Sequence, residues 1–219
     1  MKQCGMLTIH HLGKSQSERI VWLCEELAIP YSLKLYRRDA VTMLAPPELR
    51  ALHPAGTAPI LTDDGGMVLP ESAAIAEYIL ARHGGGRLAP GPQHPDFANY
   101  LYWFHFANGN LQPHAGRNMI LARLDLPADN KVLLSARERL TRAYAMLEQR
   151  LGQVPYLAGS DFTAADVMNL FSVTTMRYFS PWDLAPYPNV LAYIQRMAAR
   201  PAYQSAMRKG DSGMPLLLT

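Results

Sequence analysis

The sequence predicts a mixed α/β domain followed by an all-helical domain. Two observations carry this prediction: strand and helix patterns alternate through residues 1–84, and helical periodicity fills residues 96–219. Between them, residues 85–95 are rich in glycine and proline and are predicted to be a linker. A chain of 219 residues, 49% of them hydrophobic, can supply one large core or two small ones.

The first domain is predicted to begin with a strand, a helix and a second strand. Residues 7–10 form a short strand pattern, residues 17–27 repeat apolar side chains at helical spacing, and residues 31–36 alternate as a strand does. Pro30 separates the helix from the second strand. Because strands joined by a helical crossover run parallel, we expect a right-handed parallel pair.

A short helix, a hairpin and a longer helix complete this domain. Two prolines open the short helix over residues 48–52, because proline suits a first helical turn. Asp63-Asp64-Gly65-Gly66 is a strong hairpin signal between strands at residues 60–62 and 67–69. A helix over residues 71–82 completes the order β-α-β-α-β-β-α. The helices predicted for the second domain cover residues 96–121, 131–151, 163–178, 189–199 and 202–209.

Charge and cysteine usage exclude several classes of protein. The net charge is +3 and the longest basic cluster is Arg37-Arg38, so small anions fit better than nucleic acid as ligands. Charges return at Lys14, too early for a secretory or membrane segment. Cys4 and Cys24 have neither metal-ligand nor C-x-x-C spacing. We therefore expect a cytoplasmic protein without metal, in which Cys24 is a buried, inert thiol and Cys4 has no assigned role.

A proline begins the third predicted strand. Pro59 follows Gly56, Thr57 and Ala58, and it cannot donate a hydrogen bond to a neighbouring strand. A cis Ala58-Pro59 bond would turn the chain and point the Ala58 N–H and C=O groups toward a ligand. An ordinary proline at a sheet edge is the alternative.

Glu71 and Ser72 lie where the fourth strand runs directly into a helix. A helix N-terminus favours an anion, because its first amides lack partners and the helix dipole is positive there. The Ser72 hydroxyl could bind the same anion, while the Glu71 carboxylate could bind an ammonium group. An amino-acid-like ligand would satisfy both. The alternative is that Ser72 only caps the helix.

A structural motif opens the third helix predicted for the second domain. Thr163 and Asp166 have the spacing of a capping box, and Phe162 and Val167 have that of a hydrophobic staple. We expect this motif to set where the central helix of the domain begins, with no part in catalysis.

The ordered set of these motifs resembles the soluble (cytosolic) glutathione transferase superfamily over nearly the whole chain. The set consists of the Pro59 turn, Glu71-Ser72 and the segment from Gly159 to Asp166. The start of the chain, from His11 to Leu23, looks like the serine-type bacterial and fungal branch. The resemblance implies a thioredoxin-like first domain that binds glutathione, an all-helical second domain that holds an electrophile, and a homodimer.

In that branch the catalytic hydroxyl lies four residues before an arginine of the first helix, and Ser15 matches this place before Arg19. Glutathione must react as a thiolate, yet a thiol with a pKa of about 8.5 is mostly protonated at neutral pH. A hydroxyl donating to sulfur at a helix N-terminus would stabilise the thiolate. Two alternatives stay open: Ser15 forms a capping box with Glu18, or Ser17 is the donor.

The resemblance also implies roles for the other candidate residues. The Ala58 backbone should pair with the cysteinyl unit of glutathione, and Glu71 and Ser72 should hold its γ-glutamyl end. Thr57 and Pro59, on either side of Ala58, should also belong to the glutathione site. The candidates for the glycine carboxylate are Arg50, then His53, Arg37 and Arg38. The candidates for the second-substrate pocket are Tyr102, His105 and Tyr178, with Trp182 as a further guess.

Three functions are compatible with these residues. The first is conjugation of glutathione to small hydrophobic electrophiles. The second is glutathione-dependent reduction of disulfides or peroxides at the same site, although the turn from His11 to Ser17 contains no cysteine of its own. The third, from a different class, is a non-catalytic binding protein built on the same fold.

Overall fold

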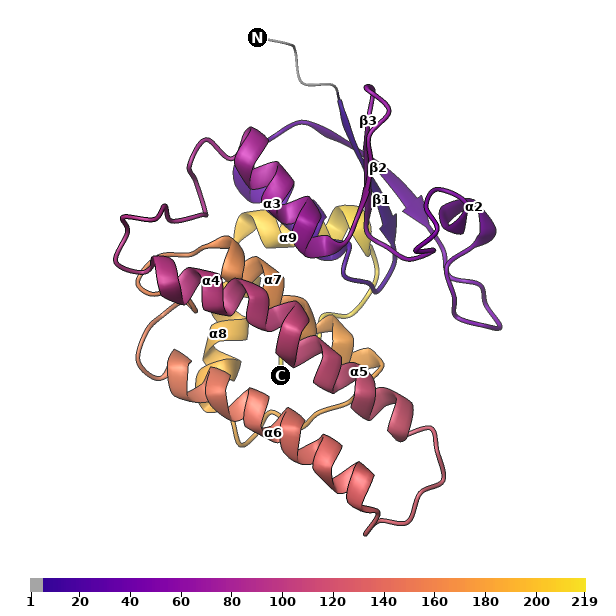
Figure 1. Ribbon diagram of the computed structural model, residues 1–219, viewed down its shortest axis with the longest axis vertical. Coiled ribbons are helices and arrows are strands. Elements are labelled where there is room, and N and C mark those ends of the chain that lie inside the picture. The colour runs from indigo at the N-terminus through magenta and orange to yellow at the C-terminus, as the bar shows by residue number, and fades with distance from the viewer. Residues whose placement is uncertain (1–5) are drawn as a thin grey trace. The chain divides into compact units, whose positions relative to one another are not determined.

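The computed structural model describes residues 6–219, so Cys4 lies outside the described residues. The chain divides into two compact units (Figure 1). The first unit contains the chain up to Arg87 together with Ala199–Pro215, and the second contains Leu88–Ala198 together with Leu216–Thr219. Within the described part, no helix is both long and apolar enough to cross a membrane.

The first unit is built on a four-stranded mixed sheet with the order β2-β1-β3-β4. Its strands are β1 (Leu7–Leu12), β2 (Tyr31–Tyr36), β3 (Ile60–Asp63) and β4 (Val68–Pro70). Strand β1 pairs with β2 in parallel and with β3 antiparallel, and β3 pairs with β4 antiparallel. The predicted order of elements and the parallel first pair are both confirmed, and the domain is thioredoxin-like.

Helices cover both faces of this sheet. Helices α1 (Glu18–Leu27) and α3 (Ser72–His83) pack against each other on one side, whereas the short α2 (Pro47–Arg50) lies on the other (Figure 1). Strand side chains alternate between the two faces, so neighbouring residues of β1 point in opposite directions. On the side of α2, the core contains Leu12, Tyr36, Ala45, Leu49 and Ile60.

The last helix, α9 (Pro201–Gly210), packs against α1 in the first unit. The Tyr203 ring meets the Trp22 indole edge-on at 5.0 Å, and Arg200 binds both carboxylate oxygens of Glu26 at 2.6 and 2.8 Å. The division predicted from sequence differs here, because it assigns all of residues 96–219 to the helical domain. The apolar periodicity of α9 identifies a helix but does not say which core that helix completes.

The second unit is all-helical. Its elements are α4 (Phe97–Phe106), η1 (Ala107–Leu111), α5 (Gln112–Leu121), α6 (Lys131–Leu151), α7 (Ala164–Val173), η2 (Thr175–Tyr178) and α8 (Pro188–Ala198). Every residue of α7 is buried, which makes it the central helix of the unit. The side-chain amide of Asn169 on α7 donates to the Trp103 carbonyl of α4 at 2.7 Å.

Two of the helices predicted for this unit are interrupted. A π-helical turn at Ala107–Leu111 divides the segment predicted as one helix over residues 96–121. This turn contains Gly109 between two asparagines, and these residues weaken α-helical preference. The helix predicted over residues 163–178 ends at Val173, where the Thr174 hydroxyl donates back to the Leu170 carbonyl and a 3-10 turn follows.

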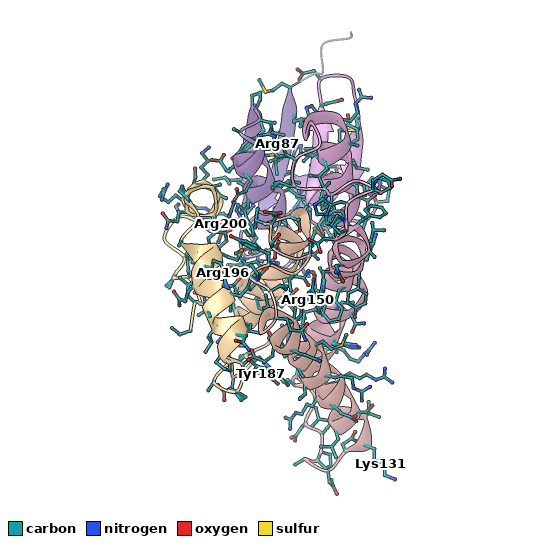
Figure 2. The ribbon with its side chains drawn as sticks, turned by 90° about the vertical axis from the view of Figure 1, so that its left-hand side faces the viewer. Arg87, Lys131, Arg150, Tyr187, Arg196 and Arg200 are labelled. Atoms are coloured by element: carbon teal, nitrogen blue, oxygen red, sulfur yellow. The ribbon has the colours of Figure 1, made fainter. Side chains whose placement is uncertain are left out.

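The predicted capping box at the start of α7 is confirmed. The Asp166 carboxylate accepts from the Thr163 amide at 2.9 Å, and the Thr163 hydroxyl accepts from an amide of the first turn. Asp166 also accepts from the Leu157 amide at 2.9 Å and the Tyr193 hydroxyl at 3.1 Å. Arg150, labelled in Figure 2, donates to the Leu157 carbonyl and holds the approach to this motif in place.

Cys24 is fully buried on α1, and burial raises the pKa of its thiol to about 12. A thiol with this pKa is almost entirely protonated at neutral pH and is therefore unreactive, as expected. In a Cys4→Ser variant, in which Cys24 is the remaining cysteine, we expect no alkylation of the folded protein by iodoacetamide over an hour. Mass spectrometry should show complete alkylation once the chain is denatured. Modification of the folded protein would contradict this prediction.

Candidate active site

The register of the sheet brings three loops to one edge. Antiparallel pairing sets His10 of β1 opposite Ile60 of β3, and Ile60 opposite Pro70 of β4. The loop after β1, the residues before β3 and the residues after β4 therefore all lie at the same end of the sheet. Two helices, α1 and α3, begin in these loops, so the positive ends of two helix dipoles are also at this edge.

The Ala58-Pro59 peptide bond at this edge is cis, as predicted. Pro59 is buried, and Ala58 is half-buried and packs against the core on the side of α2. Thr57, one residue earlier, is exposed.

The loop after β1 carries Ser15 and Ser17, whose hydroxyl oxygens are 2.7 Å apart. Ser15 Oγ accepts from the Ser17 amide at 3.2 Å, while the Glu18 amide donates to the Ser15 main-chain oxygen at 3.1 Å. The side chain of Ser17, at the N-cap position of α1, makes no capping hydrogen bond. The contacts of Ser15 are therefore those of a serine turn and differ from those of a capping box with Glu18.

The two hydroxyls have different surroundings. Ser17 Oγ lies in the interior, 2.9 Å from His11 Nδ1 and 3.2 Å from the Leu12 amide that donates to it. Ser17 is 0% exposed, whereas Ser15 retains 8% of its surface. Ser15 is thus the outer member of the pair.

A buried arginine joins the starts of α1 and α3. Arg19 Nη1 donates to Gln16 Oε1 at 2.9 Å and to Ser72 Oγ at 3.1 Å, and Ser72 Oγ donates to Gln16 Oε1 at 3.1 Å. Burial lowers the pKa of Arg19 to about 9, although the charge of Glu18 acts in the opposite direction. These bonds hold the two helix N-termini together and commit the proton of the Ser72 hydroxyl to Gln16.

Glu71 occupies the N-cap position of α3 and is exposed. Its φ is 72°, a left-handed backbone conformation that non-glycine residues rarely adopt and that clusters at functional sites. Its carboxylate makes no capping hydrogen bond. The residue predicted as a possible plain cap, Ser72, is instead the first residue of the helix.

The candidate cations lie around α2 and the loops beside it. Arg50 is the exposed last residue of α2, and its stem passes within 3.7 Å of the place where a Cβ on Gly56 would lie. His53 Nδ1 accepts from the Ala55 amide at 3.1 Å, so its ring is part of the next turn. Arg38 donates to the carbonyls of Gly13, Lys14 and Met43, whereas Arg37 is exposed.

The residues predicted for the second-substrate pocket belong to the second unit. Tyr102 and His105 are exposed on α4, and Tyr178 is half-buried in η2. Partial burial raises the pKa of Tyr102, whose ring meets Trp103 edge-on at 5.0 Å. Trp182 stacks on the buried Tyr144 at 5.5 Å and is part of the packing of this unit.

Sequence reasoning missed two residues behind the serines, His11 and Asp211. His11 Nε2 lies 3.1 Å from Asp211 Oδ2, and both side chains are almost fully buried. One belongs to β1 and the other follows α9, so no sequence spacing connects them. Among the described residues, no group of three or more His, Cys, Asp or Glu side chains could hold a metal ion.

This edge of the sheet brings together several groups that could bind an anion. It combines two helix N-termini, a hydroxyl near the surface, a cis-proline turn and an exposed carboxylate. The helix N-termini favour a carboxylate or a thiolate, whereas Glu71 favours an ammonium group. A small ligand that carries both kinds of charge fits this combination better than a simple anion does.

Known proteins share the two-domain architecture described above. A glutathione S-transferase N-terminal domain model matches residues 15–82, and a glutathione S-transferase C-terminal domain model matches residues 112–201. Glutathione S-transferase 3 of Schizosaccharomyces pombe is 31% identical over 93% of this chain and 88% of its own. Glutathione S-transferase GstB of Escherichia coli is 26% identical over 92% of this chain and 98% of its own.

Solved structures show the same fold. A glutathione S-transferase from Actinobacillus pleuropneumoniae superimposes with a TM-score of 0.86 at 31% identity, covering 95% of this chain and 94% of its own. A sphingomonad glutathione S-transferase, solved in complex with glutathione, gives a TM-score of 0.74 at 22% identity. It covers 95% of this chain and 100% of its own, and at that identity the likeness extends to the fold alone.

Proposed function

Since this chain belongs to the glutathione S-transferase family, we propose that it conjugates the thiolate of glutathione to small hydrophobic electrophiles, with Ser15 as the hydroxyl that stabilises the thiolate. The observation that carries this proposal is the position of Ser15. Its hydroxyl is the outer one of the pair and lies just before α1, at the end of the sheet that also carries the cis-proline turn and the start of α3. A sulfur anion at that place would receive both a hydrogen bond and the favourable end of a helix dipole.

Ser17 is the weaker candidate for the thiolate donor. Its oxygen is fully buried, accepts from the Leu12 amide and lies within hydrogen-bonding distance of His11 and Ser15. A sulfur atom could reach it only by displacing these partners. Its surroundings therefore favour a supporting role behind Ser15.

The rest of the tripeptide is proposed to follow the edge of the sheet. Ala58 would pair its main chain with the cysteinyl unit, flanked by Thr57 and Pro59. The exposed carboxylate of Glu71 would bind the ammonium group of the γ-glutamyl end, and the α3 N-terminus that begins with Ser72 would bind the carboxylate beside it.

The far end of glutathione is proposed to meet a cation. Arg50 is our first choice for the glycine carboxylate because it is exposed and its stem lies against Gly56, just before the cis-proline turn. His53 is second, because its Nδ1 already accepts a hydrogen bond within its own turn.

The electrophile is proposed to lie against the helical domain, where Tyr102, His105 and Tyr178 remain the candidates. A cytoplasmic homodimer is proposed as the working state. Large apolar residues are exposed on α4, α5 and α6, namely Leu101, Ile120, Val132 and Leu134, and a second subunit would cover such residues. Light scattering of the purified protein tests this assembly, and a monomer at micromolar concentration would contradict it.

The test of the function is direct. The purified protein should bind immobilised glutathione, elute with free glutathione, and conjugate glutathione to chlorodinitrobenzene. Parallel assays with a disulfide and with an organic hydroperoxide separate conjugation from reduction. Turnover of either of these, without turnover of the electrophile, would favour the reductase alternative. Neither binding nor turnover would favour a non-catalytic binding protein.

Glu71→Gln should weaken the binding of glutathione with little effect on the chemical step. Loss of one hydrogen bond between charged groups costs about 1.5–3 kcal/mol, so KM for glutathione should rise about tenfold or more. The kcat should change by less than about twofold, because the γ-glutamyl end is bound equally in the ground state and the transition state. Steady-state kinetics measure both, and Glu77→Gln, an exposed position of the same helix, is the matched control.

A further inference from the structure

A line of four side chains runs from the end of α9 to the proposed thiolate donor. Asp211 Oδ2 lies 3.1 Å from His11 Nε2, His11 Nδ1 lies 2.9 Å from Ser17 Oγ, and Ser17 Oγ lies 2.7 Å from Ser15 Oγ. All four residues belong to the first unit. The side chains of His11 and Asp211 are 1% and 4% exposed, so bulk water does not compete for these contacts.

The surroundings of His11 hold its ring in one place. A Cβ on Gly210 would lie 2.9 Å from His11 Cε1, so glycine in the last turn of α9 leaves room for the ring. A Cβ on Gly13 would lie 3.3 Å from Asp211 Oδ1, the oxygen that accepts from the Lys14 amide at 2.8 Å. The carboxylate and the imidazole are therefore positioned by packing on both sides.

The protons of this line can be assigned from its geometry. The carboxylate oxygen 3.1 Å from Nε2 does not form a hydrogen bond with it. A negative charge at this distance from a buried ring favours the positively charged imidazolium, which carries a proton on both nitrogens. Ser17 Oγ already accepts from the Leu12 amide, and a hydroxyl oxygen accepts at most two hydrogen bonds. Whether His11 Nδ1 carries a proton therefore decides in which direction the hydroxyls of Ser17 and Ser15 donate.

If Nδ1 has no proton, it accepts from Ser17, and Ser17 then accepts from Ser15 across 2.7 Å. The Ser15 proton points inward in that case. If Nδ1 carries a proton, it fills the second acceptor position of Ser17, and the Ser17 proton goes either to Ser15 or to the Leu12 carbonyl, 3.3 Å away. In either case Ser17 Oγ accepts no further hydrogen bond, so the Ser15 proton has to point outward.

We propose that His11, protonated on both ring nitrogens between Asp211 and Ser17, is a positioning residue that turns the Ser15 hydroxyl toward the sulfur of glutathione. This inference rests on the proposed function of Ser15. No covalent bond breaks and no proton is transferred to glutathione. His11 acts only by setting which oxygen donates and which accepts in the hydrogen bonds between it and Ser15. The Asp211 carboxylate also acts on the Arg38 guanidinium: burial lowers the pKa of Arg38, and the charge of Asp211 opposes that shift.

The central experiment is His11→Leu in the full chain, with the pKa of bound glutathione read from the ultraviolet absorbance of its thiolate. We expect this pKa to rise by about one unit and kcat at neutral pH to fall about tenfold, with KM for glutathione within about threefold. His11→Asn places an amide donor near the position of Nδ1 and should recover most of kcat. A merely structural role for His11 predicts no such recovery.

The matched control is His10→Leu. His10 belongs to the same strand but points to the opposite face, where it contacts the hydroxyls of Tyr36 at 2.8 Å and Thr62 at 3.1 Å. Its loss also removes a buried imidazole from β1, yet it should leave the pKa of bound glutathione unchanged. An equal shift in both variants would overturn the proposal, because it would show a general effect of disturbing the strand.

A double-mutant cycle with Ser17→Ala tests the line itself. Without Ser17 Oγ the Ser15 proton has no inward acceptor and the state of His11 cannot reach Ser15, so adding His11→Leu to Ser17→Ala should cause less than about a twofold further loss of kcat. Additive losses would overturn the proposal. If His11→Leu does not fold, Asp211→Asn removes the carboxylate that favours the doubly protonated ring, and a wild-type thiol pKa in that variant would refute the line.

Ser15→Ala, measured in the same series, distinguishes a failure of the proposed role of Ser15 from a failure of the proposed role of His11. An unchanged thiol pKa in that variant would refute the proposed donor and, with it, the role of His11. A raised pKa in Ser15→Ala, together with a wild-type value in His11→Leu, would refute only the role of His11.

Discussion

Replacing Ser15 by alanine is expected to lower kcat at neutral pH about a hundredfold, with KM for glutathione rising less than about threefold. In the proposed function the hydroxyl donates to the sulfur anion, so its loss should return the thiol pKa toward its ordinary value of about 8.5. The binding of the two ends of glutathione depends on other residues and should persist. Steady-state conjugation of chlorodinitrobenzene at varied glutathione concentration separates the two constants.

The pH dependence of this variant gives a second test. Below the thiol pKa, each unit of pH raises the thiolate fraction about tenfold, so the Ser15→Ala variant should gain activity steeply between pH 6.5 and about 8.5. The activity of the wild-type protein should change little with pH over the upper part of this range. Ser160→Ala, at an exposed position, is the control. Wild-type activity in Ser15→Ala would assign thiolate stabilisation to Ser17 or to backbone amides.

Replacing Asp166 by alanine is expected to lower the free energy of unfolding of the helical unit by about 3 kcal/mol. The Asp166 carboxylate is 0% exposed and accepts from the amides of Leu157 and Thr163 and from the hydroxyls of Thr163 and Tyr193. Alanine would leave these donors buried without an acceptor. At about 3 °C per kcal/mol for a protein of this size, the melting temperature should fall by about 10 °C in calorimetry.

Asp161→Ala is the control for this prediction, because Asp161 is exposed in the same loop and its nearest polar contact is the neighbouring Ser160. A change of more than about 1 kcal/mol in the control, or of less than about 1 kcal/mol in Asp166→Ala, would contradict the assignment. Kinetic constants measured well below the melting temperature should be unchanged in Asp166→Ala, since the motif is structural.

The stability contributed by Asp166 should also depend on pH. Burial raises its pKa from 3.8 to about 6, in spite of the four hydrogen bonds that act in the opposite direction. A carboxyl whose pKa is raised on folding contributes its full stability below pH 3.8 and loses it as the pH rises through about 6. The deficit of Asp166→Asn relative to wild type should therefore be larger at pH 4 than at pH 7.

The sequence by itself determined the features that depend on neighbouring residues. The order of strands and helices followed from periodicity and from turn residues, and the capping box from the spacing of Thr163 and Asp166. The proline placed where a strand begins indicated a cis peptide bond, although the structure was needed to exclude an ordinary edge proline. Each of these is a local preference of the backbone, so a short stretch of chain contains the information.

Only the tertiary structure decided the features that join distant parts of the chain. The packing of α9 in the first unit, the bond of Arg19 to Ser72 and the pairing of His11 with Asp211 all connect residues without a common spacing. The difference in burial between Ser15 and Ser17 is of the same kind, because it depends on which hydroxyl the interior surrounds. Burial and side-chain contact are properties of the folded chain, and periodicity indicates which face of an element is apolar but not what covers it.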